Sequence, residues 1–285
     1  MMQAQYFRPS DLVSALDWLA TTDTRIAAGC TDLLASTSDP RLSGNILDIT
    51  AIEELRGITS SDEHWRFGAT TTWTDVIEAD LPPAFDSLKL AAREVGSQQI
   101  QNAGTLAGNL CNASPAADGV PCWLTLDAEV ELVSKVSVRR LPITSFITGP
   151  RKTKLSRGEL VSAILVPRSS CSGRSTFLKL GARKYLVISI AMVAVRMEVN
   201  HGLIEDSAIS VGSCSAVAVR MTDLEASLAG QPIDEVDVTE LSALVHGNIN
   251  PIHDLRSDAN ARANAAGELV QRCIVSLRSE MVSTP

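Results

Sequence analysis

Apolar residues recur at helical spacing soon after the N-terminus. Ser10 precedes a segment whose leucines share one helical face, at positions Leu12, Leu16 and Leu19. The short apolar segment at residues 25–28 predicts a strand that passes through a tight turn into a helix start. A second strand is expected at residues 45–49, beyond a polar loop around Pro40. A helix between two strands favours a small parallel sheet over residues 1–56.

The pattern changes near residue 65. A helix at 84–95 leads into a glycine-rich stretch, and alternating or apolar segments then predict a mainly antiparallel sheet from strands at 129–133, 136–141 and 159–166. A polar, basic loop is expected at 149–154. A linker-like segment at 167–173 precedes an α+β module with strands at 175–180, 190–199 and 204–212 and helices at 234–246 and 258–280. We therefore expect three parts, at residues 1–56, 57–170 and 171–285.

Composition narrows the class of protein. The 285 residues are 45% hydrophobic and 20% charged, as is usual for a soluble globular chain of two or three small domains. The net charge of −8 argues against a nucleic-acid binder. No apolar run reaches the length of about 18 residues that suggests a membrane span, and the N-terminus has no secretory apolar core. A cytoplasmic location is expected.

Cysteine and histidine spacing gives no metal signature. The six cysteines include no C-x-x-C pair, which counts against a zinc site, an iron–sulfur cluster or a redox dithiol in this chain. Reduced thiols packed as small hydrophobic groups are favoured over disulfides. The four histidines are far apart, and surface loops are the expected place for them.

Residues 96–118 are unusually rich in small and polar residues. Gly104, Ala107 and Gly108 leave backbone N–H groups bare, and hydroxyls and amides stand beside them at Thr105, Asn109, Asn112 and Ser114. Such a backbone nest suits an anion, most commonly a pyrophosphate, and little of the stretch is expected to be ordinary helix or strand. The spacing is neither the G-x-G-x-x-G of a Rossmann unit nor that of a P-loop. The stretch therefore indicates a nucleotide-binding site of another type.

A second turn, at residues 28–32, reads Ala-Gly-Cys-Thr-Asp after the first strand. Taken alone, either turn is more simply explained as a tight turn whose small residues serve the backbone conformation only. Together they resemble the FAD-binding subunit of the molybdenum hydroxylases, the xanthine dehydrogenase and carbon monoxide dehydrogenase medium-chain family. Further matching segments occur in the same order, at residues 149–153, 158–161, 177–183 and 254–257. Cys30 and Ala107 replace usual glycines, Ala261 replaces a common tyrosine, and the cysteine-rich insertion of some relatives is absent.

The resemblance implies an α+β fold. A two-subdomain FAD-binding domain of the PCMH (vanillyl-alcohol oxidase-like) type would be followed by a small C-terminal α+β domain of the CO dehydrogenase flavoprotein type. FAD would lie between the first two parts. Its predicted contacts from the first part are Arg25, Ile26, Ala27, Ala28, Gly29, Cys30, Thr31, Asp32 and Leu33. The predicted contacts from later segments are Thr105, Leu106, Ala107, Gly108, Asn109, Asn112, Asp118, Leu160 and Lys179.

Three of these residues have simpler interpretations. Leu160 fits equally well as an ordinary sheet-core residue. Lys179, which the resemblance places near the carbonyl edge of the flavin ring, could instead be a solvated strand lysine. Cys30 beside a flavin could be redox-active or carry a covalent link, but a small residue lining the turn is favoured.

The function implied by the resemblance is electron transfer, with no catalytic side chain and no metal in this chain. A large subunit with the molybdenum cofactor and a small subunit with two [2Fe-2S] clusters would be its partners, in a dimer of heterotrimers. Electrons would leave through FAD to NAD, a quinone, oxygen or another acceptor. A free-standing flavin oxidoreductase with the same fold and a scaffold protein without flavin remain alternatives.

Overall fold

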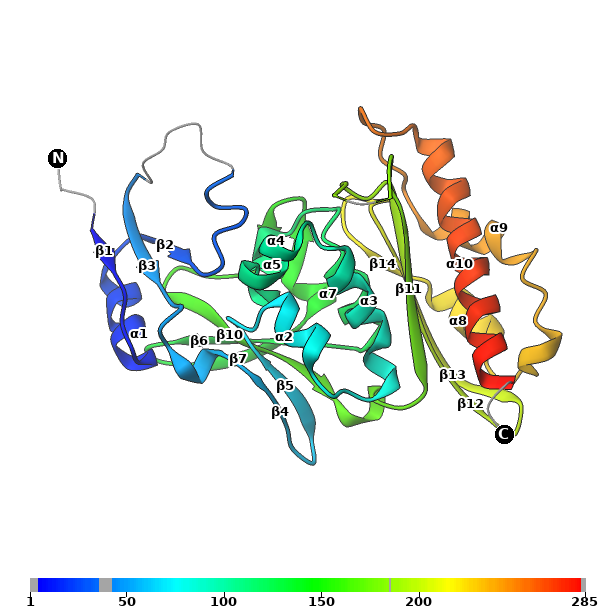
Figure 1. The fold of residues 1–285 in the computed structure, drawn as a ribbon, viewed down its shortest axis with the longest axis horizontal. Helices are drawn as coiled ribbons and strands as arrows, with labels where there is room; N and C mark the ends of the chain where they lie inside the picture. The colour runs from blue at the N-terminus through cyan, green and yellow to red at the C-terminus, as the bar shows by residue number, and fades with distance from the viewer. Residues whose placement is uncertain (1–4, 36–42, 185, 283–285) are drawn as a thin grey trace.

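Three β-sheets follow one another along the chain and frame the structure (Figure 1). The computed structural model describes residues 5–35, 43–184 and 186–282. The first sheet is parallel, in the order β1 (Tyr6–Phe7), β3 (Asn45–Asp48), β2 (Thr24–Ala27). Helix α1 (Leu12–Thr21) joins β1 to β2, so the predicted helix and parallel sheet are confirmed.

Two details of this first part differ from expectation. The N-cap of α1 is Asp11 rather than Ser10, because the Asp11 carboxylate accepts a hydrogen bond from the Ser14 amide at 2.8 Å. Residues 31–35 form hydrogen-bonded turns instead of a helix start. The predicted Pro40 loop lies outside the described residues.

The second sheet is antiparallel, in the order β4 (Ile58–Ser60), β5 (His64–Gly68), β10 (Glu159–Pro167), β6 (Glu129–Ser134), β7 (Val138–Pro142). Its core also takes in residues of α2 (Trp73–Glu78), α3 (Asp86–Glu94) and α6 (Gly119–Thr125). The three strands predicted here are confirmed. The segment expected as a loop at 149–154 instead contributes to a small hairpin, β8 (Ile147–Gly149) and β9 (Lys152–Thr153), that follows the short α7 (Ile143–Phe146).

The third sheet is also antiparallel, in the order β11 (Arg174–Leu180), β12 (Ala191–Asn200), β13 (Leu203–Gly212), β14 (Val219–Arg220). Helices α3 and α6 pack against it from the second part, while α8 (Thr222–Leu228) and the long α10 (Ala259–Val282) pack against it from its own part. The helix predicted at 234–246 begins only at α9 (Leu241–Asn248), because Asp237 holds the Thr239 amide in a local turn.

Single turns of 3-10 helix complete the fold, at η1 (Glu53–Leu55), η2 (Pro83–Phe85), η3 (Arg168–Ser170) and η4 (Ile233–Glu235). Buried contacts cross between the three parts. Val133 and Leu160 of the second sheet belong to the apolar cluster of the first part, and Phe177 and Met192 of the third sheet belong to that of the second. The boundaries at residues 56 and 170 therefore stay a prediction.

Candidate functional site

A cavity of about 810 Å³ opens where the three parts meet. Residues 28–33 line one side of it, residues 104–112 line another, and Leu186, Val187 and Ile188 line a third. All predicted site residues line this cavity except Arg25, Ala27, Leu106 and Lys179. In β2 Arg25 is exposed and Ala27 is buried, and Leu106 faces the core on the inner side of its helix.

The glycine-rich stretch is helical, contrary to expectation. Helices α4 (Gln98–Ala103) and α5 (Leu106–Asn112) occupy it, capped by Ser97 and Thr105. The Thr105 hydroxyl accepts a hydrogen bond from the Gly108 amide at 3.2 Å. Gly104 and Thr105 separate the helices as an extended link that hydrogen-bonds to residues 71–73. The Thr105 hydroxyl, which was expected as a ligand group, thus caps a helix.

Gly29 forms a contact between two parts of the chain. A Cβ atom built on Gly29 would lie 1.9 Å from the carbonyl oxygen of Ala103, at the end of α4. Only glycine lets the 28–32 turn approach the second part so closely. The bare Cα that suggested approach to a nucleotide therefore serves first to join two walls of the cavity.

Cys30 follows in the left-handed conformation, with φ of +56°. Glycine adopts this conformation without strain, which explains why the motif usually has a second glycine here. Burial raises the pKa of the Cys30 thiol, and the nearby Asp48 carboxylate raises it further. Both influences disfavour the reactive thiolate.

Arg151 bridges two predicted flavin contacts. Its guanidinium donates to the Asp32 carboxylate at 2.8 Å and to the side-chain oxygen of Asn112, while its backbone amide donates to Ala113. Asp32 and Asn112 thus line the cavity with their side chains bound to an arginine. The sequence placed Arg151 in a matching segment but gave it no role.

Lys179 and Asp118 form a buried ion pair with a separation of 2.8 Å. The ammonium also donates to the carbonyls of Glu94 and Val187, and the Ser189 hydroxyl donates to Asp118 at 2.5 Å. Burial raises the pKa of Asp118, and the Lys179 charge opposes that rise. A solvated strand lysine is therefore wrong for Lys179. Leu160, in turn, is both a buried sheet-core residue and a cavity-lining one.

Comparison with known families decides what kind of chain has this cavity. The profile of the FAD binding domain in molybdopterin dehydrogenase matches residues 2–169, and that of the CO dehydrogenase flavoprotein C-terminal domain matches residues 176–277. The chain belongs to the FAD-binding subunits of the molybdenum hydroxylase family. The resemblance inferred from the motifs is thus confirmed.

Relatives of this family match over nearly the whole subunit. The xanthine dehydrogenase FAD-binding subunit of Escherichia coli is 28% identical over 276 residues, covering 95% of this chain and 94% of the relative. The glyceraldehyde dehydrogenase medium chain of Sulfolobus acidocaldarius is 31% identical over 258 residues, covering 89% and 91%. A chain of carbon monoxide dehydrogenase from Hydrogenophaga pseudoflava superposes with a TM-score of 0.87 at 25% identity, covering 98% of each chain.

Several cavity-lining residues of this FAD-binding subunit were missed from its sequence. They come from α2, from α4 and the segment before it, and from the segment between β11 and β12, at Trp73, Val95, Gly96, Ser97, Ile100, Leu186, Val187 and Ile188. The last three stand seven to nine residues after Lys179 and have no polar residue among them. Only the long-range packing of the third sheet places them against the cavity.

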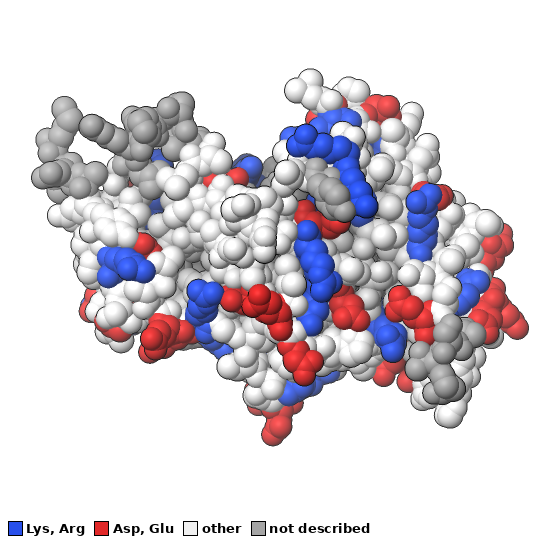
Figure 2. Space-filling view, in the orientation of Figure 1, with Lys and Arg blue, Asp and Glu red and all other residues white. Residues whose placement is uncertain are grey.

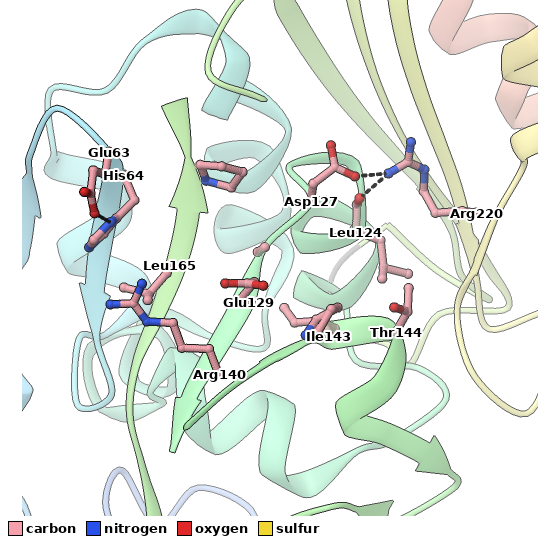
Figure 3. A pocket seen from close by; sticks show the side chains of 13 residues that line it. Glu63, His64, Leu124, Asp127, Glu129, Arg140, Ile143, Thr144, Leu165 and Arg220 are labelled. Carbon is pink, nitrogen blue, oxygen red and sulfur yellow. Dashed lines mark hydrogen bonds and ion pairs between the residues drawn. The ribbon is translucent and has the colours of Figure 1, made fainter. Parts of the chain in front are cut away.

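A second hollow, of about 500 Å³, lies at the other end of β10, between the second and third sheets (Figure 3). Its Arg220 donates to Asp127 and to the Leu124 carbonyl, and also pairs with Glu225. Arg140 pairs with Glu131 across neighbouring strands. Both guanidinium groups are thus paired with carboxylates of the protein itself.

The cysteines, histidines and surface charges of the FAD-binding subunit can also be compared with expectation. All six cysteines are free thiols, as predicted. His64 and His246 lie in β5 and α9, so surface loops were the wrong expectation for those two. Within residues 5–35, 43–184 and 186–282, no cluster of potential metal ligands occurs and no helix is long and apolar enough to cross a membrane. Acidic and basic side chains are interspersed over the face in Figure 2, so the negative charge forms no single patch there.

Proposed function

We propose that the 810 Å³ cavity holds FAD and that this subunit passes electrons from [2Fe-2S] clusters of a partner to an acceptor such as NAD. The observation that carries the proposal is that residues of both family motifs line one cavity. Its volume lies within the range of about 300–1,000 Å³ usual for small-molecule sites.

The residues present fit a flavin nucleotide. Within the described part of the chain, the side-chain oxygen of Asn109 is buried without a hydrogen-bond partner although its residue lines the cavity. An acceptor left unpaired in this way suits a donor group on a ligand. Leu160, Ile26 and Val161 supply an apolar surface on which an aromatic ring would pack.

Bound FAD supplies the redox chemistry, because its ring accepts and releases electrons. The protein's share is to bind and orient the cofactor. The 28–33 turn and the 104–112 stretch would hold its polar part, and Leu160 would keep water from one side of the ring. Asp118 lines the cavity and Lys179 does not, so Lys179 would affect the cofactor only through its ion pair with Asp118.

The relatives named medium chain or FAD-binding subunit support a place in a larger assembly. We infer a large subunit with the molybdenum cofactor and a small subunit with two [2Fe-2S] clusters as partners, in a cytoplasmic dimer of heterotrimers. The substrate would then be chosen by the large subunit.

The test is to co-express the chain with candidate large and small subunits and to record the visible spectrum of the purified assembly. Flavin and iron–sulfur bands with one FAD per chain, and bleaching of the flavin band by substrate, are expected. A chain that binds FAD and oxidises substrate alone would favour a free-standing flavin oxidoreductase, and a colourless chain indifferent to added FAD would refute both.

A matched pair of variants tests the residue assignment. Asn109→Ala removes the unpaired acceptor and should weaken FAD binding by about 3–10-fold, the usual value of one hydrogen bond. Asn264→Ala, on the exposed side of α10, should leave the dissociation constant unchanged. Equal constants for the two variants would remove Asn109 from the site.

A further inference from the structure

A buried arginine lies behind one wall of the cavity. Arg262, in the first turn of α10, is 1% exposed. Its guanidinium donates to the carbonyl oxygens of Ile190 and Ser213, at 2.5 and 3.0 Å, and to the Asp254 carboxylate at 2.6 Å. A cation so far from solvent must be compensated by its partners, which makes these contacts strong.

One carbonyl belongs to a segment that lines the cavity, and the other belongs to a segment that is hydrogen-bonded to a cavity-lining one. Ile190 ends the connection between β11 and β12 whose apolar residues form the third wall, and its own amide donates to Leu180 at 2.7 Å. Ser213 follows β13, and its amide donates to the Pro115 carbonyl, next to the cavity-lining Ala116. One side chain therefore ties together these two backbone segments.

Arginine suits this position better than any other residue. Its planar fork presents donors in fixed directions, so that it bonds two carbonyls and a carboxylate at once, whereas a lysine ammonium is a point charge without that geometry. Asp254 is itself held by the amides of Arg256 and Ser257. Burial alone would raise the pKa of Asp254, but these amides and Arg262 outweigh it and lower the pKa to about 2.

We propose that Arg262 is a positioning residue for the flavin: from α10 it fixes Ile190 and Ser213, and through them the apolar wall at residues 186–188 that faces the bound ring. The proposal rests on FAD occupying the cavity. It gives the C-terminal part a defined task, because α10 supplies the group that holds a wall of a site otherwise built mainly by the first two parts.

Arg196 provides a matched control. It is equally buried, in β12 of the third sheet, and pairs with Asp206 at 2.6 Å while donating to the carbonyls of Thr125 and Ser172. None of these partners lines the cavity. Arg196→Lys should therefore cost stability much as Arg262→Lys does, without reaching the flavin.

The experiment compares Arg262→Lys, Arg196→Lys and the wild type as full chains. We expect Arg262→Lys alone to weaken FAD binding about tenfold and to change the visible circular dichroism and midpoint potential of the bound flavin. Both variants should show similar falls in Tm. Equal FAD affinity, dichroism and potential in the two variants would overturn the proposal.

Two further measurements keep the result decisive. Asp254→Asn leaves Arg262 in place but removes the charge that pairs with it, and should shift the same flavin properties by a smaller amount. This variant replaces Arg262→Lys in the comparison if Arg262→Lys does not fold. Amide hydrogen exchange of residues 180–190 in the FAD-free chain should be faster in Arg262→Lys than in Arg196→Lys. Since that comparison needs no flavin, it separates failure of the positioning role from failure of the proposed cofactor.

Discussion

Replacing Lys179 by methionine tests the most deeply buried ion pair near the cavity. The substitution keeps most of the side-chain volume and removes the ammonium that lies 2.8 Å from Asp118. The Asp118 carboxylate then retains only the Ser189 hydroxyl as a side-chain partner, and the carbonyls of Glu94 and Val187 lose a donor. The change therefore leaves a buried charge without compensation.

The expected cost is about 3–5 kcal/mol of unfolding free energy, the usual result of removing one partner from a buried pair. Lys135 offers a matched control, because its ammonium lies at the same 2.8 Å from Asp17 but both side chains are more than half exposed. Lys135→Met should cost less than about 1 kcal/mol. The double variant Lys179→Met/Asp118→Asn should recover part of the loss, since it removes the stranded charge as well.

The pH dependence gives an independent check. Burial already raises the pKa of Asp118, and loss of the opposing ammonium must raise it further. In Lys179→Met the carboxyl is therefore neutral at low pH, and the penalty should shrink as pH falls and grow as pH rises.

The assay is guanidinium unfolding followed by tryptophan fluorescence, between pH 5 and 8, with and without FAD. A loss below about 1 kcal/mol in Lys179→Met, matching Lys135→Met, would refute the reasoning from burial. A double variant less stable than the single one would show that the pair is not coupled as described.

Three other predictions concern backbone and charge. Gly29→Ala should unfold more readily and lose FAD, because its Cβ would lie 1.9 Å from the Ala103 oxygen. The control Gly247→Ala in α9 meets no atom within 4 Å, and its unfolding free energy should rise by about 0.5–1 kcal/mol in denaturant titrations. Cys30→Gly should keep FAD binding and relieve about 1 kcal/mol of left-handed strain, whereas Cys30→Val should raise strain and lower Tm; the reverse order would contradict the strain argument. Asp254→Asn should lower Tm by a constant amount from pH 5 to 8. That difference should shrink as pH falls below the ordinary pKa of an aspartate and should be mostly lost near pH 2, where the wild-type carboxylate becomes protonated; a difference of undiminished size at pH 2 would exclude the charge as its cause.

Local patterns predicted the elements whose stability comes from one buried face. The strands at 129–133 and 159–166 were evident because alternation or a continuous apolar run is enough to define a half-buried or buried strand. The helix predicted at 258–280 was found as α10 for the same reason. Each of these elements meets its partners along its whole length, so its own sequence contains the signal.

The cavity needed information from pairs far apart in sequence. Asp118 and Lys179 are both charged residues in matching motifs, but nothing local shows that one neutralises the other and that only Asp118 reaches the cavity. The position of Thr105 beside glycines predicts a ligand group, although its hydroxyl is the N-cap of α5. Hydroxyls serve both purposes, and the choice depends on whether a helix follows.

The family motifs therefore describe the frame of the cavity as much as its ligand contacts. Gly29 is required because Ala103 lies against it, and a glycine is usual at the position of Cys30 because the backbone there is left-handed. It follows that loss of FAD in a Gly29 variant is not proof that Gly29 contacts FAD. A contact is shown only where binding weakens and the unfolding free energy of the FAD-free chain does not fall. Asn109→Ala should behave in this way, because the wild-type Asn109 oxygen has no protein partner to lose within the described residues. Gly29→Ala should change both quantities together, because it separates two walls before any ligand arrives.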